Sequence, residues 1–457
     1  MLDPQRGVPN ESHKAKPRLA IVSTFDDLCG IAGYTRFLIK QIEMHFDVEV
    51  FDLDQFFMRS RNYKVRKQAD EMIRDYCRRM SEFDFVNVQL EHGTLGRKRE
   101  DILERFRMIA TAAPALSVTF HSVLPQDDSF PWGDFGSRLK RGDLRAAATM
   151  IARYRTNKVL NHGIYTLLRR LQRRKPVRVI VHTRRDMRLM KYVNGVKEVF
   201  DHPLSFLSRE EAQRLRDETK RSDIAGLANL PADAKLIGVF GFLNEYKGFH
   251  TAIRALHLLP SNFHLALFGG LHPSAIKQGE PVNAYVRRLM DETYADRSVL
   301  DALPHGEISM SIAADKVDQL FDHPKNIGSR VHFMGTQTDD NFARGMAVCD
   351  FVVLPYHEIG QSSSGPMSIA LEMGARILAS RNGAFLQFAR YHPDVIEFFE
   401  IGNHLELAER IRSPRATPSC KPRYDVSTNA AVYIAANTKV EAKRTIADVS
   451  AQPTLVT

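Results

Sequence analysis

A run of small polar residues, Ser362-Ser363-Ser364-Gly365, is the part of the sequence best suited to hold an anion. The apolar run at 351–354 predicts a buried strand before it, and the apolar spacing at 367–373 predicts a helix after it. A turn from a strand's carboxyl end into a helix offers unpaired N–H groups and the positive helix end, which both favour phosphate. An ordinary helix cap is the alternative. The position of the turn between strand and helix favours the phosphate hypothesis.

A glycine turn, Gly30-Ile-Ala-Gly33, follows the first predicted strand at 18–24 and opens a helix. Because glycine has no Cβ, the backbone of such a turn allows a ligand to come close. The spacing is not G-x-G-x-x-G, so the dinucleotide fingerprint is absent. Tight packing of the helix against the strand is the alternative explanation.

Polar residues also stand where two other predicted strands end. Gln89, Glu91 and His92 close the strand at 85–90, and His121 follows the strand at 116–120. Doubly wound sheets bind ligands outside the carboxyl ends of their strands, so these side chains are candidates for a binding site. A purely structural hydrogen bond is the alternative for His121.

Strands and helices alternate along the whole chain, which predicts an α/β protein. A length of 457 residues exceeds one ordinary core and suits two doubly wound domains facing each other across a cleft. We predict a disordered N-terminus (1–17), an N-terminal domain (18–225), a C-terminal domain (235–412) with an insertion (271–329), and a tail (413–457).

The composition is that of a soluble globular protein, with 44% hydrophobic and 26% charged residues. No apolar run reaches the roughly 18–20 residues of a membrane span, and the polar first residues lack the apolar core of a signal peptide. We therefore expect a cytoplasmic protein. The four cysteines are far apart, so we expect neither a zinc site nor a disulfide framework.

A net charge of +10 is compatible with nucleic acid, an anionic membrane surface or a phosphorylated substrate as partner. Much of the positive charge lies in a predicted helical region at 136–175, where Ile164, Leu167, Leu168 and Leu171 share a face. Such a helix can lie on anionic lipid, which would make the protein peripheral on the inner face of the membrane. A solvated helix face is an equal alternative. No RNA-binding motif accompanies the charge, so we do not expect a nucleic-acid partner.

Taken in order, these segments resemble the group-1, family-four-like glycosyltransferases, which have the GT-B architecture. Gly30-Ile-Ala-Gly-Tyr-Thr35 is similar to that family's "G-G-I-x-x-Y-T", and Thr119-Phe-His121 to its "T-x-H". Lys247-Gly248 matches the end of "G-R-x-x-x-x-K-G". The segments 331–335, 349–356 and 371–380 match its "V-x-F-x-G", "A-D-x-x-V-x-P-S" and "E-A-M-A-x-G-x-P-V-V-A-S".

The resemblance implies two Rossmann-like domains, a nucleoside-diphosphate sugar as donor, and a tail helix that crosses back onto the N-terminal domain. It implies catalytic roles for His121, at the transferred sugar, and for Lys247, at the donor phosphates. Candidates for binding the donor diphosphate and nucleotide are Gly30, Gly33, Lys247, Ser363, Ser364, Gly365 and Met367. Candidates near the donor sugar are Glu358, Gln361 and Ser362, and candidates on the acceptor side are Gln89, Glu91 and His92.

The chain departs from the family pattern at two places. Phe242 stands where the phosphate-binding arginine is expected. The usual pair of glutamates separated by seven residues is absent, because Glu358 and Glu372 are separated by thirteen. Alignment on Gly365 puts Ser362 and Ala370 at the expected positions. The sequence is closer to a variant of the family that lacks the usual pair of glutamates and reads "S-S-G-x-x-S-x-A-L" at this point.

These observations predict a glycosyltransferase that moves a sugar from a nucleoside-diphosphate donor to a glycan or lipid-linked acceptor, in polysaccharide or glycoconjugate biosynthesis. Lys247 and the amides of the serine turn would stabilise the leaving diphosphate without a metal or cofactor. The resemblance also implies that the anomeric configuration is retained. The alternatives are a nucleotide-sugar epimerase that uses Glu91 and Glu358, and a catalytically silent binding or scaffold protein of the same fold.

Overall fold

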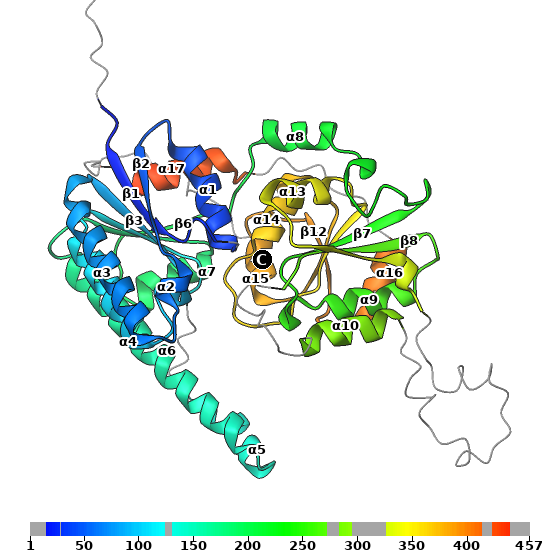
Figure 1. Cartoon of the computed structure of the whole chain (residues 1–457), viewed down its shortest axis with the longest axis horizontal. Helices are drawn as coiled ribbons and strands as arrows, with labels where there is room; N and C mark the ends of the chain where they lie inside the picture. The colour runs from blue at the N-terminus through cyan, green and yellow to red at the C-terminus, as the bar shows by residue number, and fades with distance from the viewer. Residues whose placement is uncertain are drawn as a thin grey trace, which may run out of the picture.

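The computed structural model describes residues 15–27, 29–123, 130–271, 283–294, 326–413 and 423–438. Within them the chain forms two α/β domains that lie side by side, each built on a six-stranded parallel sheet (Figure 1). Most of the expected insertion and tail, and the first fourteen residues with their expected disorder, fall outside these ranges.

The sheet of the N-terminal domain has the strand order β2-β1-β3-β4-β5-β6. Every residue of β3 and β4 is buried, because helices cover both faces of the sheet, and this explains their continuous apolar runs. The strand order reverses between β1 and β3, and a crevice opens at the carboxyl ends of strands at such a point. The strands are β1 (Arg18–Ser23), β2 (Asp47–Asp52), β3 (Phe85–Leu90), β4 (Leu116–Phe120), β5 (Val177–Val181) and β6 (Val199–Asp201).

Alternate side chains of β1 enter the two faces of this domain's core. Leu19 and Ile21 pack with Leu38 of α1, whereas Ala20 and Val22 pack with residues of α3, α4 and α6. The helices are α1 (Gly30–Ile42), α2 (Gln55–Met58), α3 (Tyr63–Arg79), α4 (Arg99–Ala112), α5 (Trp132–Lys140), α6 (Leu144–Leu171) and α7 (Arg184–Arg188).

The sheet of the C-terminal domain has the order β12-β11-β10-β7-β8-β9 and reverses between β7 and β10. Its crevice is therefore expected where the loops after β7 and β10 begin. The strands are β7 (Lys235–Phe240), β8 (Phe263–Phe268), β9 (Val331–Gly335), β10 (Phe351–Leu354), β11 (Ile377–Ser380) and β12 (Ile396–Phe399).

Helices α9, α10 and α16 cover one face of this second sheet, and α13, α14 and α15 cover the other (Figure 1). Helix α8, which falls in the predicted N-terminal domain, contacts α13 instead. The helices are α8 (Arg209–Glu218), α9 (Phe249–His257), α10 (Ala284–Tyr294), α13 (Asp339–Ala347), α14 (Gly365–Glu372), α15 (Gly383–Ala389) and α16 (His404–Arg412).

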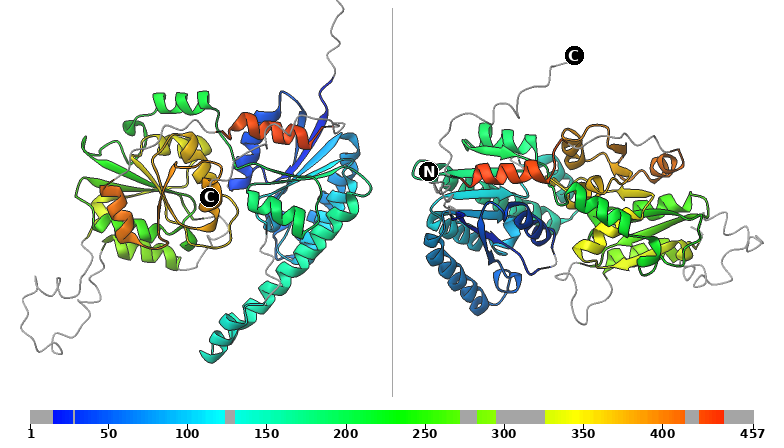
Figure 2. Two further views of the ribbon diagram at one scale, coloured as in Figure 1. Left: turned by 180° about the vertical axis from the view of Figure 1, so that it is seen from behind. Right: turned by 90° about the horizontal axis from the view of Figure 1, so that it is seen from above.

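The basic region at 136–175 is divided between α5 and α6, which meet at Gly142, whose φ is +73°. The apolar face that we expected to meet lipid is instead part of the core, since Ile164, Leu168 and Leu171 are buried. That detail of the prediction is wrong, because α4 packs along this part of α6. Helix α5 and the first turns of α6 extend away from the body of the molecule (Figures 1 and 2). No helix within the described ranges combines the length and apolarity needed to cross a membrane.

The segment at 202–208 joins the domains, and the carboxylate of Glu372 at the end of α14 binds it. Glu372 Oε1 accepts from Ser205 Oγ (2.7 Å) and from Phe206 N (2.9 Å), and Oε2 accepts from Leu207 N (3.0 Å). Burial raises the pKa of Glu372 to about 7, although these three donors lower it. Glu372 therefore attaches the C-terminal domain to the connecting segment.

Helix α17 (Val426–Ala436) returns to the N-terminal domain, where it contacts α1, β5 and β6 (Figure 2). The hydroxyl of Tyr433 lies 3.0 Å from Thr119 Oγ1 and 3.3 Å from the hydroxyl of Tyr34. The end of the described chain thus closes one face of the first sheet.

We expect Glu372 to make stability depend on pH. Its pKa is raised by folding, so the folded state binds more protons than the unfolded state between pH 4.5 and about 7, and stability falls across that window. Relative to Glu372→Gln, which cannot titrate, the wild type should lose on the order of 2–3 kcal/mol of unfolding free energy between these pH values. Urea denaturation at several pH values measures this difference.

Glu71→Gln is the matched control, because Glu71 is an exposed carboxylate on α3. It should follow the wild type at every pH. A constant difference between the wild type and Glu372→Gln from pH 4.5 to 7 would contradict the expected titration.

Candidate functional site

The crevices of the two sheets face each other across a cavity of about 440 Å³. The N-terminal domain contributes the start of α1 and the residues that follow β3 and β4, and the C-terminal domain contributes the loops after β7 and β10. A cavity at the switch points of two parallel sheets is the expected place for a ligand. The predicted site residues that line it are Gly30, Gly33, Glu91, His121, Lys247, Gln361, Ser363 and Gly365.

Lys247 brings the main positive charge into this cavity. Its side chain is buried, and its Nζ lies 3.8 Å from the ring centre of Tyr356 and 5.1 Å from that of Tyr246. Burial lowers the pKa of Lys247 to about 7. Among the residues that the structure describes, no carboxylate lies within ion-pair distance of it, so the ammonium group is held ready for an anion.

Two glycines make the position of Lys247 possible. Gly248 has φ +67°, and a Cβ there would stand 1.9 Å from the carbonyl oxygen of Pro355. A Cβ on Gly241 would stand 3.2 Å from Lys247 Cε. The loop after β7 therefore packs closely against the loop after β10, and the lysine occupies the space left by Gly241.

The serine turn begins α14 as predicted, with Gly365 as its first residue. Ser364 occupies the N-cap position but its side chain makes no capping hydrogen bond, and its buried hydroxyl lies next to that of Tyr356. The explanation of Ser364 as an ordinary cap is thus not supported, and the first N–H groups of α14 lack a side-chain acceptor. Gln361 Nε2 donates to the carbonyl oxygen of Ser363, which fixes the turn where Ser363 lines the cavity.

His121 is held by Gln89. Gln89 Nε2 donates to Asn87 Oδ1 (2.6 Å), so its Oε1 is the atom that faces His121 Nε2 at 2.8 Å. A carbonyl oxygen only accepts, which assigns the proton to His121 Nε2. Burial, and then the neighbouring His182, lower the pKa of His121 well below its usual value. The imidazole is therefore neutral, with a fixed tautomer and Nδ1 free of its proton.

Of the three residues predicted to bind the acceptor substrate, one lines the cavity and two do not. Glu91 lines the cavity, and burial raises the pKa of its carboxyl group. Gln89 does not line it, because its amide lies in the core of the first domain beneath His121. His92 is also buried outside the lining, and burial lowers its pKa to about 4. Polar residues at a strand end alternate in direction, and the sequence alone did not say which of them point outward.

Four further predicted residues lie outside the lining of the cavity. Glu358 accepts hydrogen bonds from Gly383 N (2.5 Å) and Gly360 N (2.8 Å) and so holds the start of α15. Ser362 Oγ accepts from Val123 N of the other domain at 3.2 Å. The other two are Ser364 and Met367, which are buried beneath the turn.

Several lining residues were missed by the sequence analysis. Tyr34, which appears there only within the segment Gly30–Thr35, meets the ring of His121 edge-on at 5.4 Å. Arg36 Nη2 lies 2.7 Å from Asp339 Oδ2, so an ion pair joins α1 to α13 at the cavity. Tyr246 directly precedes the recognised Lys247-Gly248, but the spacing of residues gave no signal for its ring. No local pattern could reveal a pair 303 residues apart.

The chain contains one Asp-x-Asp sequence, Asp52-Leu53-Asp54, and it is not part of this cavity. Asp52 Oδ1 accepts from Phe25 N at 2.7 Å, and Asp54 caps α2 by accepting from Phe56 N at 2.8 Å. These carboxylates hold local backbone at the end of β2.

The arrangement was compared with known proteins. No family model matches the sequence, and no curated protein matches it either. The crystal structure of HepE from Anabaena in complex with UDP and glucose has a TM-score of 0.55 at 15% identity, covering 93% of this chain and 100% of that one. A UDP-forming α,α-trehalose-phosphate synthase from Burkholderia xenovorans has 0.57 at 9% identity, with coverage of 93% and 100%. Sucrose-phosphate synthase from Thermosynechococcus elongatus has 0.51 at 13% identity, with coverage of 87% and 89%.

Similarity over whole chains at such low identity shows the fold. Two parallel six-stranded sheets with flanking helices, facing each other across a cavity, are the two Rossmann-like domains of the GT-B fold. The fold class predicted from the sequence is therefore confirmed.

Proposed function

We propose that this protein is a glycosyltransferase that transfers a sugar from a nucleoside-diphosphate sugar to a glycan or lipid-linked acceptor. The observation that carries the proposal is the single cavity into which both domains send groups suited to that reaction. Lys247 and the serine turn come from one side, and His121 and the glycine turn come from the other.

The leaving group of such a transfer is a nucleoside diphosphate, whose negative charge grows as the glycosidic bond breaks. The buried ammonium group of Lys247 has no carboxylate partner in the part of the chain that the structure describes, and it shares the cavity with the N-terminus of α14. This arrangement is preorganised for that charge. We therefore propose that the reaction needs neither a metal nor another cofactor, and that the diphosphate lies between Lys247 and Ser363. Gly30 would face it from the other domain, since no atom lies within 4 Å of a Cβ built there.

His121 would contact the transferred sugar through its Nδ1 acceptor, positioned by Gln89. Glu91 would lie on the acceptor side. Retention of configuration, and a place in polysaccharide or glycoconjugate biosynthesis, remain parts of the proposal that come from the family resemblance. The Anabaena HepE structure is a complex with UDP and glucose, which makes a uridine donor the first to test here.

An epimerase is less well supported, because Glu358 is occupied in holding the start of α15 and leaves Glu91 as the predicted carboxylate at the cavity. A catalytically silent scaffold protein of the same fold is the second candidate, because Phe242 stands where the family has a phosphate-binding arginine. Binding of a ligand would not exclude a scaffold protein, whereas sugar transfer or hydrolysis of the donor would.

The membrane part of the proposal moves to the exposed side chains of the α5–α6 hairpin. Trp132, at the start of α5, and Leu144, at the start of α6, are 71% and 67% exposed, although both are large and apolar. Residues 132–175 hold twelve Lys and Arg and two Asp, a net charge of +10 that equals the net charge of the whole chain. Exposed aromatic and aliphatic groups among basic ones suit an anionic lipid surface, and a lipid-linked acceptor would be found there.

Lys247→Met tests the donor site, because methionine keeps the length of the buried stem and removes the charge. Loss of a charge-assisted contact should weaken binding of UDP and UDP-glucose by roughly 10- to 100-fold, measured by titration calorimetry. Without ligand the variant should be at least as stable as the wild type, since burial of the charge is unfavourable. Lys235→Met, at the other end of β7, is the control. Equal affinity in all three proteins would remove Lys247 from the donor site.

The pKa of Lys247 sets the pH dependence of donor binding. UDP-glucose should bind the protonated lysine, so affinity should fall as pH rises above about 7, by up to about tenfold per pH unit. UDP-glucose suits this test because its diphosphate does not titrate between pH 6 and 8.5. Lys247→Arg keeps its charge and should give a flat profile. A wild-type profile as flat as that of the arginine variant would show that this lysine does not titrate in the site.

The role of the α5–α6 hairpin is tested by sedimentation with vesicles of phosphatidylglycerol or phosphatidylcholine. We expect binding to the anionic vesicles that weakens with salt, and a loss of about tenfold or more in Trp132→Ser, because the ring no longer leaves water. Tyr63→Ser replaces an equally exposed aromatic side chain on α3 and should change nothing. Equal binding by Trp132→Ser and the wild type would contradict this role of the hairpin.

A further inference from the structure

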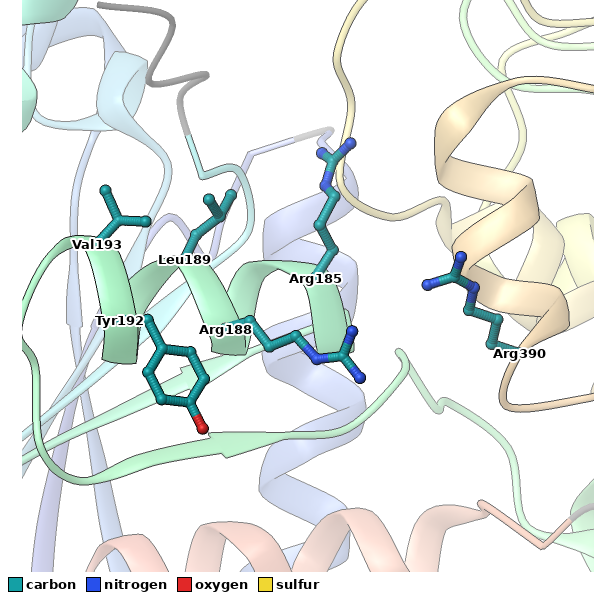
Figure 3. A pocket seen from close by; sticks show the side chains of 6 residues that line it. All are labelled: Arg185, Arg188, Leu189, Tyr192, Val193 and Arg390. Carbon is teal, nitrogen blue, oxygen red and sulfur yellow. The ribbon is translucent and has the colours of Figure 1, made fainter. Parts of the chain in front are cut away.

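A second, smaller cavity of about 240 Å³ lies between α7 and α15 (Figure 3). None of its residues lines the larger cavity. Arg185 and Arg188 belong to α7, and Arg390 follows the last residue of α15, so both domains contribute. We call these three residues with Leu189, Tyr192 and Val193 the arginine pocket.

The backbone holds apolar groups beside these arginines. Thr183 caps α7, two residues after the end of β5, and the helix continues into a π-helical turn at Leu189–Val193. Such turns are rare and often occur at functional sites, since their extra residue redirects side chains. Tyr192 and Val193 are 82% and 58% exposed. The arginine pocket therefore has an aromatic and aliphatic wall that does not belong to the core.

Positive charge in the pocket is poorly balanced by the protein itself. Within the described ranges, no carboxylate lies within 4.0 Å of the guanidinium of Arg188 or Arg390, and Arg390 Nη1 donates instead to the neutral Gln387 Oε1, at 3.4 Å. Arg185 has the carboxylate of Asp186 at 3.7 Å, but that group is fully buried. Figure 3 shows Arg188 and Arg390 pointing toward one another from opposite sides. Guanidinium groups keep their charge at any physiological pH, so this arrangement favours an anion between them.

The arginine pocket borders the proposed donor site through one loop. Burial raises the pKa of Asp186, and the hydroxyls of Thr183 and Ser362 and the guanidinium of Arg185 lower it, so Ser362 lies next to α7. Its neighbours Gln361 and Ser363 line the larger cavity. One loop therefore separates the arginine pocket from the proposed donor site.

We propose that the arginine pocket binds a phosphate group of the acceptor, with Tyr192 and Leu189 against the adjoining sugar or lipid. This inference rests on the proposed transferase function. A phosphate monoester carries up to two negative charges and three acceptor oxygens, which suits guanidinium groups that converge from different elements. Because Arg390 comes from the other domain, the acceptor would bridge both domains as the donor does.

The test measures binding of glucose 6-phosphate, dihexanoyl phosphatidic acid and glucose by calorimetry, without any donor. The proteins are the full-length wild type, Arg188→Gln, Arg390→Gln and the double variant, with Arg287→Gln on α10 as an exposed control. We expect one phosphate compound to bind the wild type, and each single substitution to weaken it roughly tenfold or more. Glucose should not bind detectably, and the control should stay within twofold of the wild type. The phosphate compound that binds tells whether the acceptor is a sugar phosphate or a lipid phosphate.

The proposal would be overturned if neither phosphate compound binds, or if the double variant binds them as the wild type does. UDP serves as the internal check, because it should bind the double variant normally and Lys247→Met poorly. If the wild type binds the phosphate compound through its arginines but does not bind UDP, both the acceptor assignment and the proposed transferase function are wrong. The arginine pocket would then be an anion site with another role. UDP binding without phosphate binding would overturn the arginine pocket alone.

Discussion

The carboxylate of Glu372 is the contact on which the geometry of this molecule most depends. It accepts three hydrogen bonds from the segment that passes between the domains, so the end of α14 and that segment cannot move apart separately. The cavity begins at the other end of the same helix, at Gly365. A rigid eight-residue helix thus connects the joint between the domains to the turn that faces the proposed donor. Leaving those donors unsatisfied would be costly, because buried N–H groups without partners destabilise the folded state.

Two other contacts involve both parts of the chain, and they hold the domains less firmly than Glu372 does. Helix α17 closes the first sheet after the chain has completed the second domain, and Tyr433 places its hydroxyl among polar groups under the site. The ion pair of Arg36 with Asp339 crosses the cavity near solvent, where such pairs contribute little stability. It can therefore open without great loss. The hydrogen bonds of Glu372 behind the cavity would hold the lining groups in position. The weak ion pair of Arg36 with Asp339 would let ligands enter.

The buried positive charge of Lys247, which suits an anion, lowers the stability of the folded protein. Lys247 is enclosed by Tyr246 and Tyr356, and burial without a counter-ion disfavours its charged form. The protein tolerates this in the place where a diphosphate would supply the missing negative charge. The arginine pocket at the surface also holds positive charge that the protein does not neutralise, because Arg188 and Arg390 lack carboxylate partners among the described residues. Two unbalanced positive sites next to each other suit a reaction between two phosphorylated molecules.

The sequence by itself determined the strands, the glycine and serine turns, and the GT-B arrangement. Consecutive residues encode these features, because a strand buried on both faces must be a continuous apolar run and a tight turn needs glycine. His121 was predicted because it directly follows a strand, and Lys247 because Lys247-Gly248 resembles a family motif; both line the cavity. The tertiary structure alone decided that Gln89 supports His121, that Glu358 and Glu372 hold backbone, and that Arg188 and Arg390 line the same cavity. Those pairings join residues from different elements and domains, so their distances follow from how the two sheets pack and from no local pattern of the chain.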